Sequence, residues 1–157
     1  MKWQTQEQYA SCQLVAATNA ALILGAIKRR PGHGKQWERL VDLTLCRAGS
    51  CLDVFSAHRY FGIEAVPIPK GLAAVRRHVK RGRPVEINVW LPWAGFHAVL
   101  VVDYKPPTHE RRGIYAVLNY YKNQSDLLWI SANELSFAMR SVVASLTRDH
   151  CYFRLTG

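Results

Sequence analysis

The sequence lacks any apolar stretch long enough to cross a bilayer. Its longest apolar segment, Leu14 to Ile27, is interrupted by Thr18 and Asn19 and is shorter than the roughly 20 residues that a membrane-spanning helix needs. The N-terminal stretch MKWQTQEQYA also lacks the apolar core of a secretory signal peptide. We therefore expect a soluble, cytoplasmic protein with no membrane partner, in which the four cysteines are reduced.

Acidic residues are scarce, because 11 Asp and Glu stand against 21 Lys and Arg and leave a formal net charge of +10. This imbalance indicates an acidic partner, such as nucleic acid, an anionic envelope or an acidic protein. The excess is concentrated between residues 70 and 83, which contain no acid and six basic residues: Lys70, Arg76, Arg77, Lys80, Arg81 and Arg83. Two interpretations stay open for this segment, a solvated helix face or a binding surface.

Several binding motifs are also missing. The chain has no glycine-rich phosphate loop and no dinucleotide fingerprint. It has no repeat, low-complexity run or linker, so residues 1–157 are interpreted as a single domain. A zinc site is one interpretation of Cys46, Cys51 and His58, but the sequence offers no fourth ligand. A disulfide between Cys46 and Cys51 is the alternative. We expect no metal and no cofactor.

The hydrophobic period changes near residue 83, from mainly helical (1–82) to mainly extended (83–157). Val85, Ile87 and Val89 alternate with Glu86, Asn88 and Trp90, as in a strand with one buried face. The predicted helices are 12–27, 35–47, 50–61, 71–81 and 131–140. The predicted extended segments are 63–68, 85–90, 97–104, 114–119, 142–147 and 151–155, the last two forming a closing hairpin. This order predicts an α+β fold, with a helical lobe packed on an antiparallel sheet and a cleft between them.

Cys12 stands at the start of an alanine-rich helix, and a buried helix has no structural need for a thiol in its first turn. Unpaired N–H groups and the helix dipole lower a thiol pKa at such a position and favour the nucleophilic thiolate. Thiol catalysis also needs an imidazole, a polar group that orients it, and donors for the oxyanion. His97 at the head of a strand, Asn119 at the end of the next, and Gln6 with the Cys12 N–H are the candidates for these roles.

Each candidate has an alternative interpretation. Cys12 and His97 fit the core of a helix and of an apolar strand. Asn119 fits ordinary turn chemistry, with Asn123, Asp126 and Asp103 as substitutes, and Gln4 and Gln8 lie close to Gln6. Trp90 and Trp93, on either side of Pro92, are interpreted either as walls of a substrate groove or as core.

The order Gln6, Cys12, His97 and Asn119 resembles that of the papain-like cysteine peptidases. Within that superfamily, the likeness is to the bacteriocin-processing peptidases that cut after double-glycine leaders. It rests on Gln6-x5-Cys12 with its alanine-rich helix, LAAVRRHVKRGRPVEINV, GFHAVLVVDY and IYAVLNYY, which together cover nearly the whole chain. Two positions depart from the pattern: Gln13 stands where those leader peptidases carry glycine, and Asn119-Tyr120 where they carry Asp-Pro.

The resemblance implies a papain-like fold and a cysteine peptidase that cleaves peptide or isopeptide bonds through an acyl-enzyme. Cys12 would be the nucleophile, His97 the base, Asn119 the group that holds the ring, and Gln6 the oxyanion donor. The expected partner is a peptide or protein substrate. Two alternatives stay open: a cell-wall peptide hydrolase that uses the same residues, and a catalytically decayed basic module that binds nucleic acid or an acidic protein.

Overall fold

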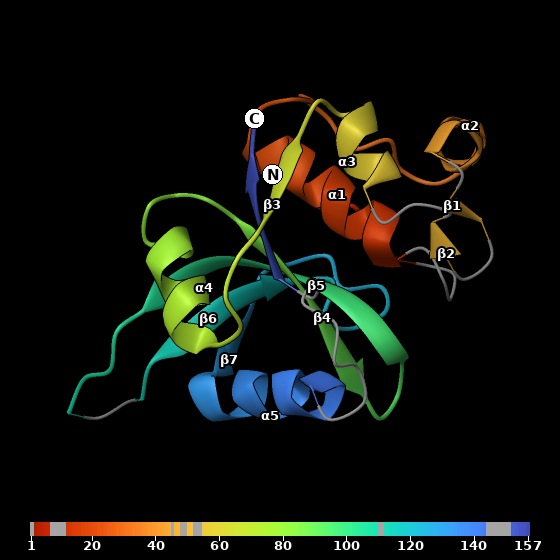
Figure 1. The fold of residues 1–157 in the computed structure, drawn as a ribbon. Helices are drawn as coiled ribbons and strands as arrows, with labels where there is room; N and C mark the ends of the chain where they lie inside the picture. The colour runs from red at the N-terminus through yellow and green to blue at the C-terminus, as the bar shows by residue number, and fades with distance from the viewer. Residues whose placement is uncertain are drawn as a thin grey trace.

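The computed structural model describes residues 2–6, 12–44, 46–47, 50–51, 55–109, 112–143 and 152–157 (Figure 1). The helices are α1 (Cys12–Ile23), α2 (Lys35–Thr44), α3 (Ser56–Tyr60), α4 (Leu72–Val79) and α5 (Ala132–Val143). The strands are β1 (Cys46–Arg47), β2 (Ser50–Cys51), β3 (Glu64–Pro67), β4 (Val85–Leu91), β5 (Gly95–Lys105), β6 (Ile114–Leu118), β7 (Leu128–Ser131) and β8 (Tyr152–Thr156). The chain therefore has an α+β fold.

The centre of the fold is a six-stranded antiparallel sheet in the order β3-β8-β4-β5-β6-β7. β4 and β5 form a long hairpin in which Val89 lies opposite His97. β6 then returns beside β5, so that Leu118 lies opposite Leu100. This register sets the start of β5 and the end of β6 at the same end of the sheet, because neighbouring antiparallel strands run in opposite directions.

Helices cover both faces of the sheet. On one face, Val85, Ile87 and Val89 of β4 share an apolar cluster with residues of α4 and α5. On the other face, Leu100 and Leu118 pack with alanines of α1. Figure 1 shows α1 and α5 on opposite sides of the strands. Among the described residues, no helix is long and apolar enough to cross a membrane.

α1 is buried on every side from Leu14 to Leu22, which explains why its sequence has no polar stripe. Its one buried amide, Asn19, fixes the N-terminal segment to the helix. The Asn19 side chain accepts from the Gln4 N–H at 2.8 Å and donates to the Gln4 carbonyl at 3.0 Å. The Asn19 amide therefore satisfies both main-chain groups of Gln4, as a neighbouring β-strand would.

Replacing Asn19 by alanine is expected to lower the free energy of unfolding by about 2–4 kcal/mol, because two buried groups of Gln4 lose their partner. Urea denaturation followed by circular dichroism measures the change. Asn133→Ala, on the exposed side of α5, is the matched control and should change stability by less than about 0.5 kcal/mol. Equal stability of the two variants would contradict the role given to Asn19.

Most predicted elements are confirmed in kind, but two predictions are wrong. The helix predicted over 50–61 begins only at Ser56, because Ser50 and Cys51 instead pair with Arg47 and Cys46 in a short ladder. The predicted closing hairpin is also wrong. Residues 142–143 still belong to α5, and β8 pairs with β3 and β4. The predicted turn around Arg148-Asp149 lies outside the described residues.

Candidate functional site

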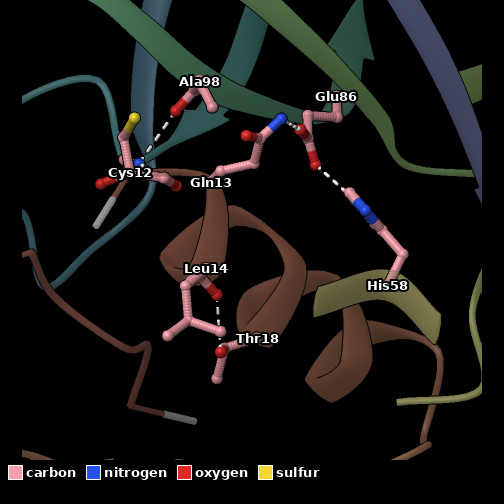
Figure 2. A network of polar contacts seen from close by, with 8 residues as sticks. Cys12, Gln13, Leu14, Thr18, His58, Glu86 and Ala98 are labelled. Atoms are coloured by element: carbon pink, nitrogen blue, oxygen red, sulfur yellow. Dashed lines mark hydrogen bonds and ion pairs between the residues drawn. The ribbon is translucent and has the colours of Figure 1, made fainter. Parts of the chain in front are cut away.

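Cys12 is the first residue of α1, and its half-buried side chain lies beside Ala98 of β5 (Figure 2). The helix packs along β5, so its N-terminus meets the beginning of that strand. The backbone of Ala98, and more weakly that of Gln13 and of Cys12 itself, lies close enough to the thiol to lower its pKa. The thiol is therefore held next to the residue that follows His97.

Burial raises the pKa of the Cys12 thiol above its ordinary value, and the negative charge of Glu86 raises it further. The backbone hydrogen bonds lower this pKa, but they do not outweigh burial. The expectation that the helix N-terminus leaves a lowered thiol pKa is therefore wrong. The first turn of α1 packs against the sheet instead of opening to solvent, so the resting side chain is a protonated thiol at neutral pH.

His97 lies in β5 and is buried. Its Nε2 hydrogen-bonds to the main-chain carbonyl oxygen of Asn119. A carbonyl oxygen only accepts, so Nε2 carries the proton and Nδ1 is the basic nitrogen. Burial lowers the pKa of His97, while the hydrogen bond to Asn119 raises it to a smaller extent. The ring is therefore a neutral imidazole with a fixed tautomer at neutral pH.

Asn119 connects the helix, the strand and the histidine. It adopts a left-handed backbone conformation with φ of 61° directly after β6. Its side-chain Nδ2 donates to the carbonyl of Cys12 at 3.0 Å and to the carbonyl of Ala98 at 2.9 Å. The sequence-based prediction was that Asn119 orients the His97 ring. Asn119 does contact the ring, but it does so with its main-chain oxygen instead of its side-chain amide.

The other candidates for the third position lie elsewhere. Asp103 is exposed and its carboxylate accepts from the N–H of Tyr104 at 2.7 Å. Asn123 is exposed and has a φ of 61° in the turn that follows Asn119. Asp126 is exposed beside Ser125, whose hydroxyl donates to its carboxylate at 3.0 Å. Asn119 is therefore the candidate that the fold brings to His97.

Gln6 is buried, and its main-chain carbonyl accepts from the N–H of Asn123 at 3.0 Å. This bond fixes Gln6 to the turn that follows Asn119. The alternative glutamine, Gln4, exchanges hydrogen bonds of 3.0 and 3.1 Å with the backbone of Gly32 instead. Gln8 lies outside the described residues. Of the candidates Gln4, Gln6 and Gln8, Gln6 is thus the described glutamine that is bonded to the turn after Asn119.

Cys12, His97 and Asn119 meet through the main chain more than through side chains. Across the described part of the chain, no hydrogen bond joins the Cys12 thiol directly to the His97 ring. The thiol contacts the backbone beside His97, and the ring contacts the backbone of the residue whose amide binds Cys12. Along β5, His97 shares the face of Val99 and Val101, whereas α1 packs against the face of Leu100, so a thiol–imidazole pair requires the ring to turn toward Cys12.

Exposed aromatic side chains border this end of the sheet. The Trp93 and Tyr121 rings stack with centroids 5.3 Å apart and planes inclined by 24°. Trp90, Trp93 and Tyr121 are 48%, 47% and 43% exposed, so the core interpretation of the two tryptophans is wrong, and the groove-wall interpretation stays a prediction. Trp93 precedes His97 in the turn between β4 and β5, and Tyr121 follows Asn119 closely, so we name Trp90, Trp93 and Tyr121 the aromatic rim.

A second polar group lies behind Cys12, and no pattern in the sequence predicts it. His58 of α3 and Glu86 of β4 are both fully buried, with Nε2 and Oε2 2.7 Å apart. Gln13 Nε2 donates to the other Glu86 oxygen at 3.5 Å, so the three side chains form a row leading away from Cys12 (Figure 2). The prediction of one buried face for β4 is wrong, because Glu86 and Asn88 are also buried on the face that α1 covers.

The metal interpretation finds no support in His58, whose ring nitrogen contacts Glu86. Within the described ranges, no group of three or more His, Cys, Asp or Glu side chains is placed to hold a metal ion. The side chains of Cys46 and Cys51 lie outside the described part of the structure.

No model of a protein family matches the chain, and no curated protein matches it. The functional interpretation therefore depends on the chemistry of the site itself.

Proposed function

We propose that the protein is a papain-like cysteine peptidase, a thiol hydrolase that cleaves peptide or isopeptide bonds. The observation that carries the proposal is the joining of Cys12, His97 and Asn119 at one end of the sheet by hydrogen bonds through Ala98 and Asn119. A helix-start thiol and a buried histidine of fixed tautomer at the same end of the sheet are two of the groups that nucleophilic catalysis requires. A merely structural cysteine needs neither.

In the first half of the proposed reaction, the Cys12 sulfur attacks the carbonyl carbon of the scissile amide, and the thiol proton passes to Nδ1 of His97. Because the resting pair is neutral, this transfer accompanies the attack. The amide of Gln6 donates to the oxyanion. The C–N bond then breaks as His97 returns the proton to the leaving amine, and a thioester remains on Cys12.

In the second half, water attacks the thioester carbonyl. Its proton passes to Nδ1 of His97, and the C–S bond breaks as the sulfur takes that proton. The products are a free carboxylic acid and the original thiol, so the cycle consumes only water. Asn119 acts as a positioning residue throughout, since its carbonyl keeps Nε2 protonated and its amide holds the Cys12 backbone.

A library of fluorogenic peptides tests the proposal, with cleavage sites located by mass spectrometry. We expect turnover by the native protein and none by Cys12→Ala. The matched control is Ala94→Ser, a small substitution in the turn before β5, which should retain activity. Peptide cleavage that persists in Cys12→Ala, or a native protein that cleaves no member of the library, would contradict the assignment.

Trp93 is expected to bind substrate through its exposed ring face. Removing one aromatic contact costs about 0.5–1.5 kcal/mol. Trp93→Ala should therefore raise KM for peptides about twofold to twelvefold and leave kcat nearly unchanged. Phe137→Ala is the matched control, because that ring is 68% exposed but belongs to α5. Equal KM values for the two variants would remove the aromatic rim from the substrate site.

A further inference from the structure

The strongest concentration of charge in the molecule lies on α4 and the turn that follows it. Residues 70–83 contain no acid, and five of their six basic side chains are exposed: Lys70, Arg76, Arg77, Lys80 and Arg81. The chain then turns at Gly82, with φ of 69°, and the Arg83 N–H donates to the His78 carbonyl at 3.2 Å. The turn therefore folds Arg83 back onto the end of the helix.

The sheet adds a further cation to this surface. Arg154 of β8 lies opposite Val66 and Val85 in the ladder, and Val85 belongs to the cluster that α4 and α5 cover. Alternation along the strand directs Arg154 to that same face, because its neighbour Leu155 packs in the α1 cluster. We name the group Arg76, Arg77, Lys80, Arg81, Arg83 and Arg154 the α4 basic face.

The pKa of His78 shows that these charged side chains lie close together. Burial lowers its pKa, and the positive charges of Arg154, Arg83, Arg81 and Arg77 lower it further. Among the residues that the structure describes, no carboxylate contributes to this shift. Four guanidinium groups from the helix, the turn and the strand thus act on a single ring.

Local structure accounts for only part of this arrangement. Cations near a helix C-terminus complement its dipole, which suits Arg76 and Arg77. Arg76 and Lys80 also lie over the Tyr104 ring, 5.7 and 5.6 Å from its centroid. No ion pair within the described residues neutralises any member of the α4 basic face. Unneutralised like charges on one surface repel one another, so a bound polyanion is the partner that they fit.

We propose that the α4 basic face binds the phosphate backbone of double-stranded nucleic acid without sequence preference. Arginine, which supplies all but one of the cations, matches phosphate oxygens with its planar fork. Single-stranded binding usually relies on exposed aromatic platforms, but the Tyr104 ring on this face is occupied by Arg76 and Lys80. These features favour duplex backbone contacts over base stacking.

This surface is separate from the proposed catalytic site. α4 packs in the apolar cluster on one face of the sheet, whereas α1, which carries Cys12, packs on the other (Figure 1). Bound nucleic acid would therefore leave the thiol accessible. The inference does not depend on the proposed function, because it requires no chemistry at Cys12.

Fluorescence anisotropy with a labelled random-sequence DNA duplex, titrated at several salt concentrations, tests the proposal. Six phosphate contacts predict a slope of log K against log salt of about −5. The variant Arg77→Gln/Arg81→Gln/Arg83→Gln should reduce the magnitude of this slope by about 3 units and weaken binding at least about tenfold at low salt. The control is Lys28→Gln/Arg29→Gln/Arg39→Gln, which removes the same charge from exposed residues outside the face. It should change affinity less than about twofold.

Equal losses in the two triple variants would overturn the proposal, because net charge alone would then explain binding. Absence of duplex binding at low salt would also overturn it, and binding of poly-glutamate without duplex binding would assign the surface to an acidic protein instead. Circular dichroism verifies folding of each variant. Should the triple variant unfold, Arg81→Gln alone, at an exposed position, should still reduce the slope by about 1 unit.

Discussion

Replacing His97 by alanine is expected to lower kcat for peptide hydrolysis by about 10²–10⁴-fold, because the reaction loses its general acid and base. The resting thiol makes this dependence strong, since its raised pKa leaves little thiolate at neutral pH without a proton acceptor. KM should change little, because the His97 ring is buried and contributes little to the binding surface. Steady-state kinetics on a cleaved peptide measures both constants.

The matched control is His109→Ala, which removes an exposed histidine from the turn between β5 and β6. Its kcat should equal that of the native protein. A kcat for His97→Ala within about fivefold of this control would contradict the general-base role. Unchanged far-ultraviolet circular dichroism separates the loss of a catalytic group from a loss of folding.

The pH dependence of kcat/KM follows from the same ring. The reaction needs the neutral form of His97, and burial lowers its pKa below the ordinary histidine value of 6.5. Activity should therefore persist below pH 6.5 and disappear only as the pH falls through the lowered pKa. A profile that already loses half its activity above pH 6.5 would contradict the environment assigned to His97.

Replacing His58 by leucine is expected to lower the free energy of unfolding by about 3–5 kcal/mol, because a fully buried carboxylate loses its partner. His58→Leu/Glu86→Leu should recover most of this loss, since an apolar pair leaves no buried group unpaired. Urea denaturation of both single variants and the double variant gives the coupling energy. Losses that simply add would show that the two side chains stabilise the fold independently.

The same pair influences the candidate nucleophile. The negative charge of Glu86 raises the pKa of Cys12, so Glu86→Gln should lower this pKa and speed alkylation of Cys12 by iodoacetamide at pH values below it. Glu64→Gln, an exposed carboxylate on β3, is the control and should leave the rate unchanged. Equal alkylation rates in the two variants would remove Glu86 from the electrostatics of the site.

Local patterns predicted the elements whose stability is local. The apolar runs that became β5 and β6 were visible in the sequence. The helix predicted over 131–140 was also visible, and the Ser131 hydroxyl caps it by accepting from the Glu134 N–H at 3.1 Å. β8 was placed beside the wrong partner, because its pairing with β3 and β4 depends on residues far away in the chain. β7 was missed, since its short segment LWIS carries no clear alternation.

In the candidate site, the sequence predicted which residues take part but not the contacts that surround them. The sequence selected Cys12, His97 and Asn119, which the fold brings to one end of the sheet. The sequence did not predict that the Asn119 carbonyl would contact the ring. Every residue type has a main-chain carbonyl, so a contact of this kind does not depend on which residue is present. The sequence-based prediction also treated Glu86 as the polar side of a strand, since nothing in β4 itself reveals that α1 covers that face.

Active-site titration with an activated peptide ester tests the central claim most directly. The account predicts a rapid burst of one acyl group per chain, with the thioester located on Cys12 by mass spectrometry and hydrolysed slowly in His97→Ala. The burst should be absent in Cys12→Ala and unchanged in His109→Ala. An acyl group on another residue, or no adduct on Cys12, would contradict the assignment of Cys12 as the nucleophile.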